Sequence, residues 1–123
     1  MRYLFVMLCL ISVGVSAHEQ TPTYVNFKTS YVEGIVSTKV KVFNKRKDAQ
    51  YYEVQVLNSE MDPVPFATNE KIVRVPYLKK KTVEVFVSRK DLVNVTYICT
   101  KSRELRSSKS KTIISSRICS KVK

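Results

Sequence analysis

Alternation of apolar and polar residues with a period of two is the feature that most restricts how this chain can fold. Residues 36–42 read Val-Ser-Thr-Lys-Val-Lys-Val, residues 52–56 read Tyr-Glu-Val-Gln-Val, and residues 83–87 read Val-Glu-Val-Phe-Val. Successive side chains of a β-strand point to opposite faces, and valine, threonine and tyrosine suit a half-buried pleated surface. The pattern therefore predicts antiparallel sheets with one packed face, in an all-β domain.

The number and spacing of such runs indicate the architecture. Polar or proline-bearing segments separate the runs, notably a charged hairpin loop at 44–50 and a longer crossing at 58–70. Seven short strands in about a hundred residues are typical of an immunoglobulin-like seven-stranded antiparallel β-sandwich. The expected strands are, in chain order, about 24–31, 36–43, 51–57, 71–76, 82–88, 95–101 and 112–122.

The first seventeen residues differ from the rest of the chain. Arg2 is followed by an apolar run from Tyr3 to Val15, and Ala17 ends a small-residue site. These are the three parts of a secretory signal peptide, and the run is shorter than the roughly 20 residues of a membrane span. We therefore expect residues 1–17 to be removed and residues 18–123 to form one periplasmic or secreted domain, with no transmembrane segment after cleavage.

Two cysteines remain after that cleavage, because Cys9 leaves with the signal peptide. An even number of cysteines in an exported chain favours a disulfide over a metal site or free thiols. Cys99 and Cys119 fall in the last two expected strands. Neighbouring antiparallel strands hold facing Cα atoms at a separation that a disulfide tolerates. The sequence therefore predicts a Cys99–Cys119 disulfide.

The residues that catalysis or cofactor binding would need are scarce. His18 is the one histidine and lies at an expected ragged end, which argues against a triad or a metal site. Glu53 and Glu84 alternate outward on strands, and Glu60 lies in a loop, so the expected role of all three is solvent-facing charge. Gly34 is the single glycine after residue 17, which excludes glycine-rich phosphate loops. We expect neither an enzyme nor a bound metal or cofactor.

A formal net charge of +12 predicts attraction to anionic partners. The basic residues are spread over strands and loops, and their one concentration, 101–111, reads most simply as a solvated loop. Nucleic acid is not an expected partner, because no aromatic residue is interleaved with that run and the chain is expected to be exported. Asn94-Val95-Thr96 is a formal glycosylation acceptor, which would matter only in a eukaryotic source.

Segments spread over the expected domain match, in order, the strand motifs of one known family. They are Phe27–Tyr31, Val40–Asn44, Ala67–Thr68, Ile72–Leu78, Thr82–Val85, Tyr97–Cys99 and Ile118–Lys121. The chain resembles the N-terminal domain of periplasmic pilus chaperones, the PapD-like family of the chaperone–usher route. It is most similar to the branch in which a long loop precedes the last strand and a disulfide ties that strand to its neighbour. The match covers the first of that family's two domains.

The resemblance implies a function and a site. In that family two basic residues in one cleft bind the terminal carboxylate of a fibre subunit, and the matching positions are Lys28 and Lys121. The last strand completes the subunit's sandwich by strand addition. The implied partners are a fibre subunit and an outer-membrane usher. The implied donor-strand residues are Thr112, Ile114, Ser116 and Ile118.

A second interpretation stays open from the residues alone. Lys28 and Lys121 also read as ordinary surface lysines, and the last strand as a plain sandwich strand paired on both sides. The chain would then be a secreted immunoglobulin-like adhesin or structural interaction domain that holds an anionic partner with its basic surface. The two interpretations differ over the edge of the last strand, which must be open for strand addition.

Overall fold

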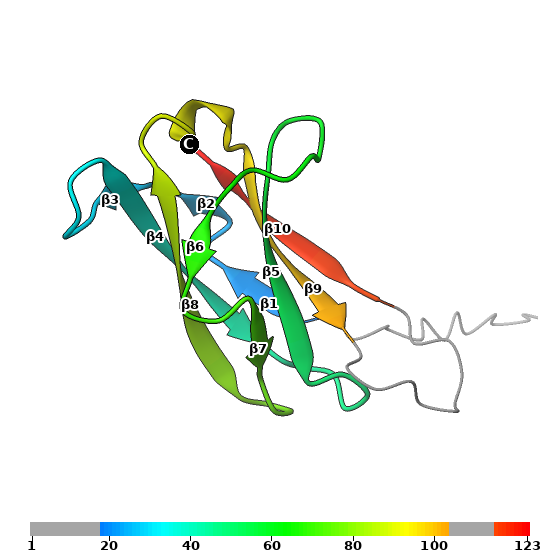
Figure 1. Ribbon diagram of the computed structural model, residues 1–123. Coiled ribbons are helices and arrows are strands. Elements are labelled where there is room, and N and C mark those ends of the chain that lie inside the picture. Colours follow the sequence, from blue (N-terminus) through cyan, green and yellow to red (C-terminus); the bar gives the residue numbers. More distant parts are fainter. Residues whose placement is uncertain (1–17, 104–114) are drawn as a thin grey trace, which may run out of the picture.

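The protein is a sandwich of two β-sheets, seen in a computed structural model that describes residues 18–103 and 115–123 (Figure 1). One sheet has the order β1-β4-β8-β6, with β3 also paired to β4, and the other has the order β2-β10-β9-β5-β7. The strands of the first sheet are β1 (Glu19–Thr21), β3 (Lys28–Thr29), β4 (Ile35–Phe43), β6 (Ala67–Thr68) and β8 (Lys80–Ser88). Those of the second are β2 (Tyr24–Val25), β5 (Tyr51–Leu57), β7 (Ile72–Arg74), β9 (Tyr97–Arg103) and β10 (Arg117–Val122).

The predicted all-β, immunoglobulin-like class is confirmed, and most strands lie where the alternation places them. The prediction of a single strand at 24–31 is wrong, because the chain crosses between the sheets there. β2 pairs in parallel with β10, whereas β3 pairs antiparallel with β4 in the other sheet. β1 and β6 were not predicted, since two or three residues are too few to show a period.

The segment 44–50 is not a hairpin loop, which corrects a second prediction. It leads from β4 to β5, and these strands lie in different sheets, β4 beside β8 and β5 beside β9. A hairpin and an inter-sheet connection have the same local sequence signals, polar residues between two alternating runs. Only the strand with which each run pairs distinguishes them. Here those partner strands, β8 and β9, lie far away in the sequence.

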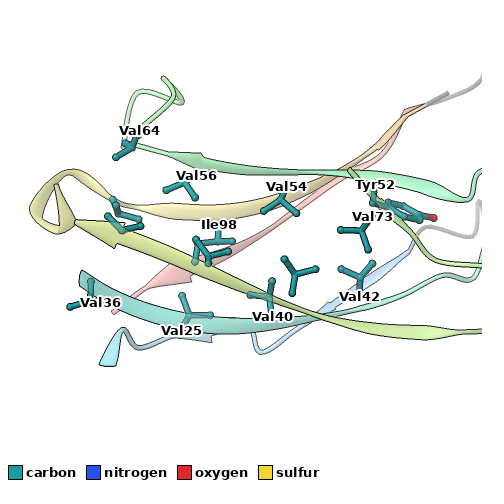
Figure 2. Packing of buried hydrophobic residues seen from close by; sticks show 14 of the residues in the cluster. Val25, Val36, Val40, Val42, Tyr52, Val54, Val56, Val64, Val73 and Ile98 are labelled. Atoms are coloured by element: carbon teal, nitrogen blue, oxygen red, sulfur yellow. The ribbon is translucent and has the colours of Figure 1, made fainter. Parts of the chain in front are cut away.

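The core lies between the sheets and consists almost entirely of valine. Val40, Val42, Val54 and Val56 are at most 2% exposed, and they belong to strands of both sheets. Figure 2 shows these side chains pointing toward one another across the interior, with Tyr52 at one end of the row. They are the apolar members of the alternating runs, so the alternation of the sequence correctly identifies the buried face of each long strand.

The segment after β4 is built around a fully buried asparagine. The side-chain amide of Asn44 donates to the carbonyl oxygens of Ala49 (2.7 Å) and Val75 (2.8 Å). Its carbonyl oxygen accepts the backbone N–H of Arg46 (2.8 Å) and the hydroxyl of Tyr52 (2.6 Å). One side chain thus fixes where the chain leaves the first sheet and enters the second. In the described part, the one helical element is a 3-10 turn, η1 (Leu92–Asn94), and no helix there is long and apolar enough to span a membrane.

Candidate functional site

The predicted disulfide is present and ties β10 to β9. Cys99 and Cys119 stand directly opposite each other in the antiparallel ladder, with their Cα atoms 4.0 Å apart. Cys99 is fully buried on the outer side of its sheet. β10 is therefore held to β9 by both the ladder and the disulfide.

The other edge of β10 is open over part of its length. The backbone N–H of Ser102 donates to Ser116 (2.9 Å) and that of Val122 donates to Thr96 (2.9 Å), so even-numbered residues bond toward β9. By the alternation of an antiparallel ladder, the N–H and C=O groups of Arg117 and Cys119 point away from β9. On that side the described residues supply a strand only from Lys121 onward, where β2 pairs with β10. Within 18–103 and 115–123, Arg117–Ser120 therefore form a strand edge that no other strand pairs with.

The side chains of β10 divide between the two faces of its sheet. Ser120 is 1% exposed and, like its partner Ile98, points into the sandwich. Ile118 has the same parity and is half-buried opposite the buried Thr100. Arg117 and Lys121 have the opposite parity and are exposed. The open edge thus presents Ile118 toward the interior and Arg117 toward solvent, and Lys121 follows on the solvent side where β2 begins to pair.

A chain of hydrogen bonds between the two sheets lies on the interior side of this edge. We call it the polar seam, and it consists of His18, Gln20, Thr100, Ser116 and Ser120. Gln20 on β1 accepts from the hydroxyl of Thr100 (2.7 Å). It donates from its amide to the Ser120 hydroxyl (2.7 Å) and the Ile98 carbonyl (2.8 Å). The seam therefore links the edge strand of one sheet to the two last strands of the other.

His18 continues the seam, and its burial corrects the expectation of a ragged end. The residue is 1% exposed, and its ring lies 4.5 Å from that of Tyr52, centre to centre. Nε2 lies 3.1 Å from the carbonyl oxygen of Thr100, which can only accept, so Nε2 carries the proton. Nδ1 then accepts from the Ser116 hydroxyl (2.9 Å). Both ring nitrogens are used within the domain, which leaves neither for a metal.

A buried arginine extends the network from the other side. Arg46 is 6% exposed and binds Asp48 through both carboxylate oxygens, while its Nη1 donates to the hydroxyls of Ser102 (3.2 Å) and Ser116 (3.3 Å). This contact lowers the pKa of Asp48 and raises that of Arg46. Burial raises the pKa of Tyr52 to about 12. The charged Arg46 therefore lies beside the uncharged polar seam. Among the described residues, Asp48 is the one acid that it contacts.

The burial of His18 predicts a pH-dependent stability. Burial first, and the Arg46 charge second, lower the His18 pKa from 6.5 to about 4, against a raising contribution from the Thr100 carbonyl. Between these values the unfolded chain binds a proton that the folded chain does not, so stability is full above pH 6.5 and falls toward pH 4. We expect a loss on the order of 2 kcal/mol over that interval.

Urea unfolding of wild type and His18→Gln at several pH values between 7 and 4 checks this expectation. His18 is the only histidine of the chain, so the variant removes the group that titrates there while the carboxylates stay the same. The wild type should lose more stability than the variant as the pH falls. Parallel pH profiles of the two proteins would show that His18 does not titrate differently on folding.

The two predicted carboxylate anchors lie in different sheets. Lys28 is exposed on β3, and it lines a surface depression together with Tyr31, Lys39 and Glu84. Lys121 is exposed on β10, does not line that depression, and stands opposite Tyr97 and Tyr24. β3 and the end of β10 both lie toward the end of the sandwich that carries the C-terminus (Figure 1). Lys28 and Lys121 sharing one cleft stays a prediction.

The predicted donor residues divide into two groups. Thr112 and Ile114 lie outside the described residues. Ile118 stands at the open edge of β10, whereas Ser116 is held by the polar seam. The structural roles of His18, Gln20 and Arg46 were not predicted. Polar residues near a chain end and in a charged connection carry no periodic signal, so only their partners across the sandwich reveal them.

Comparison with known proteins identifies the fold. No family model and no curated protein matches the chain. Among solved structures, the E. coli chaperone DraB superposes with a TM-score of 0.64 and the periplasmic chaperone SfaE with 0.53, each at 16% identity and over 86% of this chain. The PapD-like domain 7 of human CEP192 superposes with 0.55 at 7% identity, over 85% of this chain and 81% of that domain.

These likenesses confirm the predicted fold, that of PapD-like domains. The chain spans 53% of DraB and 56% of SfaE, about half the length of either chaperone. The CEP192 domain shows that the same fold occurs in a protein of a different kind. The fold therefore sets the architecture of this domain, and the function must be argued from its edge and its charges.

Proposed function

We propose that this chain is a chaperone-like module of the periplasm that binds fimbrial subunits by strand addition during fibre assembly. The observation that carries the proposal is the unpaired edge of β10 at Arg117–Ser120. An exposed strand edge pairs readily with an extended segment of another chain, unless charge, proline or a covering element prevents it. The likeness to DraB and SfaE, both chaperones, supports this use of the edge.

Rigidity of the offered strand supports the same proposal. The disulfide and the β9 ladder hold β10 on one side, and the polar seam holds Ser116 and Ser120 from within. A strand already fixed in its bound conformation loses little conformational entropy on binding, which favours affinity. The export signal proposed for residues 1–17 and the disulfide accord with an oxidising compartment.

Within this proposal, each predicted site residue has a role. Lys121 lies at the end of the open edge, and with Lys28 it would receive a subunit carboxylate through charge-assisted hydrogen bonds. Ile118 would contribute the apolar contact beside the edge. Thr112 and Ile114 would extend the donated strand. Ser116 would contribute only backbone groups to that strand, since its hydroxyl is bound to His18.

A secreted interaction or structural domain is the second candidate, and the CEP192 likeness favours it, because that domain shares the fold. Such a domain would use its basic faces and leave the β10 edge unused. The two functions therefore differ in whether the outward N–H of Arg117 matters for binding.

Proline at position 117 tests the edge directly. Because the N–H of Arg117 points away from β9, Arg117→Pro removes an outward donor and no bond of the β9 ladder. Arg117→Ala removes the same side chain and keeps the N–H, so it is the matched control. We expect Arg117→Pro to reduce co-purification of a fimbrial subunit from periplasm by at least about tenfold relative to Arg117→Ala, the equivalent of about 1.4 kcal/mol.

The unfolding midpoint of each variant is measured alongside, so that a general loss of structure is recognised. Equal capture by the proline and alanine variants, both folded, would exclude strand addition at this edge. Capture that is lost in neither variant but abolished by high salt would instead favour the interaction-domain function.

A further inference from the structure

The outer face of β9 and β10 carries cations and no acid. Lys101 and Arg103 on β9 and Arg117 and Lys121 on β10 all have the parity that points outward, and we call these four residues the basic face. Neither strand contains an acidic residue. The nearest acid in the ladder is Glu53 on β5, whose carboxylate contacts Arg103 at 3.3 Å.

Of these four cations, the two beside the open edge face no acid among the residues that the structure describes. Arg117 stands directly opposite Lys101, and Lys121 stands opposite Tyr97 on one side and Tyr24 on the other. Arg117 and Lys101 belong to the closer, non-hydrogen-bonded type of antiparallel pair, in which like charges destabilise the sheet. Both cations lie at or beside the part of β10 that has no neighbouring strand among the described residues, so they are accessible to a group from outside the domain.

We propose that the segment added to β10 is an extended peptide that alternates acidic and apolar residues. This inference rests on the proposed strand addition and adds the chemistry of the partner. A strand beside β10 would lie about 4.8 Å away, with alternate side chains on the outer face beside Arg117 and on the inner side beside Ile118. An acid opposite Arg117 and a second one two positions along, diagonal to Lys121, would neutralise both cations. The intervening residue would pack against Ile118.

Charge also disfavours a second copy of this chain as the occupant. Pairing of two β10 edges would bring Arg117 and Lys121 of both copies onto one strip of surface within a strand spacing. Like charges on an edge strand are a common means of preventing such self-association. The same charges attract an acidic strand, so they select between the two occupants.

Two capped nine-residue peptides test the inference on the whole protein. One alternates valine with glutamate, and its control carries glutamine at every glutamate position. By fluorescence anisotropy in low salt, the glutamate peptide should bind wild type at least about tenfold more tightly than the glutamine peptide, with the difference shrinking at high salt. Arg117→Lys should keep this preference, Arg117→Glu should reverse it, and Lys90→Glu, at an exposed turn, should leave it unchanged.

Each other result overturns the inference in a distinct way. Equal affinity for the two peptides would show that charge does not select the strand, while capture of a subunit could still be lost in Arg117→Pro and strand addition would stand. Glutamate-peptide binding that is equally strong in Arg117→Pro and Arg117→Ala would mean that the acid is held by the face and not by an added strand. Tighter binding of heparin or duplex DNA through Arg117 would make the basic face a general polyanion surface, and binding of neither peptide would overturn the inference outright.

Discussion

Replacing Cys99 with alanine is expected to lower the free energy of unfolding by about 2–5 kcal/mol. The disulfide spans 20 residues of sequence, and closing such a loop restricts the unfolded chain by roughly 3 kcal/mol in the chain-entropy account. Cys99 is also fully buried, so the substitution removes a buried sulfur atom as well as the crosslink. Total stabilities of small domains are about 5–15 kcal/mol, which makes this bond a large share of the whole.

Urea unfolding measures the change, and reduction provides the control. Wild type with and without dithiothreitol should differ by about the same amount as wild type and the double variant Cys99→Ala, Cys119→Ala, and the double variant should not respond to dithiothreitol. A midpoint that neither mutation nor reduction moves would show that β10 is held by its ladder alone. In that case the disulfide would not contribute to the rigidity of the proposed binding edge.

Asn44→Ala is expected to cost about 3–5 kcal/mol. The substitution leaves the carbonyl oxygens of Ala49 and Val75, the N–H of Arg46 and the hydroxyl of Tyr52 without the partner that they share. Each buried polar group left unpaired costs about 1–3 kcal/mol, and the local chain can relieve only part of that loss.

Two further variants provide comparisons for the loss of stability in Asn44→Ala. Tyr52→Phe removes a single one of the four hydrogen bonds and should cost roughly 1–2 kcal/mol. Asn69→Ala changes an exposed asparagine and should stay within about 0.5 kcal/mol of wild type. The unfolding free energies should therefore rank Asn69→Ala, Tyr52→Phe and Asn44→Ala in order of increasing loss, and an Asn44→Ala loss no larger than that of Tyr52→Phe would refute the shared-partner role.

The polar seam connects stability to the proposed function. It fastens β1 to β9 and β10 through Gln20 and His18, and it does so with hydrogen bonds that run behind the open edge. Buried, mutually satisfied polar groups impose a definite geometry on the elements that they join. Protonation of His18 would place a second cation near Arg46, so acid conditions that loosen the seam should also weaken binding at the edge.

The candidate site could be predicted in part. The Cys99–Cys119 pair follows from the even cysteine count and from the two expected last strands, and this prediction is confirmed. The proposal that Lys28 and Lys121 share a cleft was made from a family resemblance, and the structure leaves them on separate sheets. The open edge had no sequence signal, because an edge strand and an inner strand can have the same alternating residues.

The all-β class, the buried face of each long strand and the disulfide could be predicted from the residues alone, because period-two alternation and two cysteines are local and compositional signals. Tertiary structure alone decided that residues 24–29 cross between the sheets, that 44–50 joins different sheets and that His18 is buried. These outcomes depend on which strands pair, a choice made between residues up to 100 positions apart, as in the contact of Gln20 with Ser120. Alternation predicts which side of a strand is buried. It does not predict which strand lies beside it or whether an edge is left open.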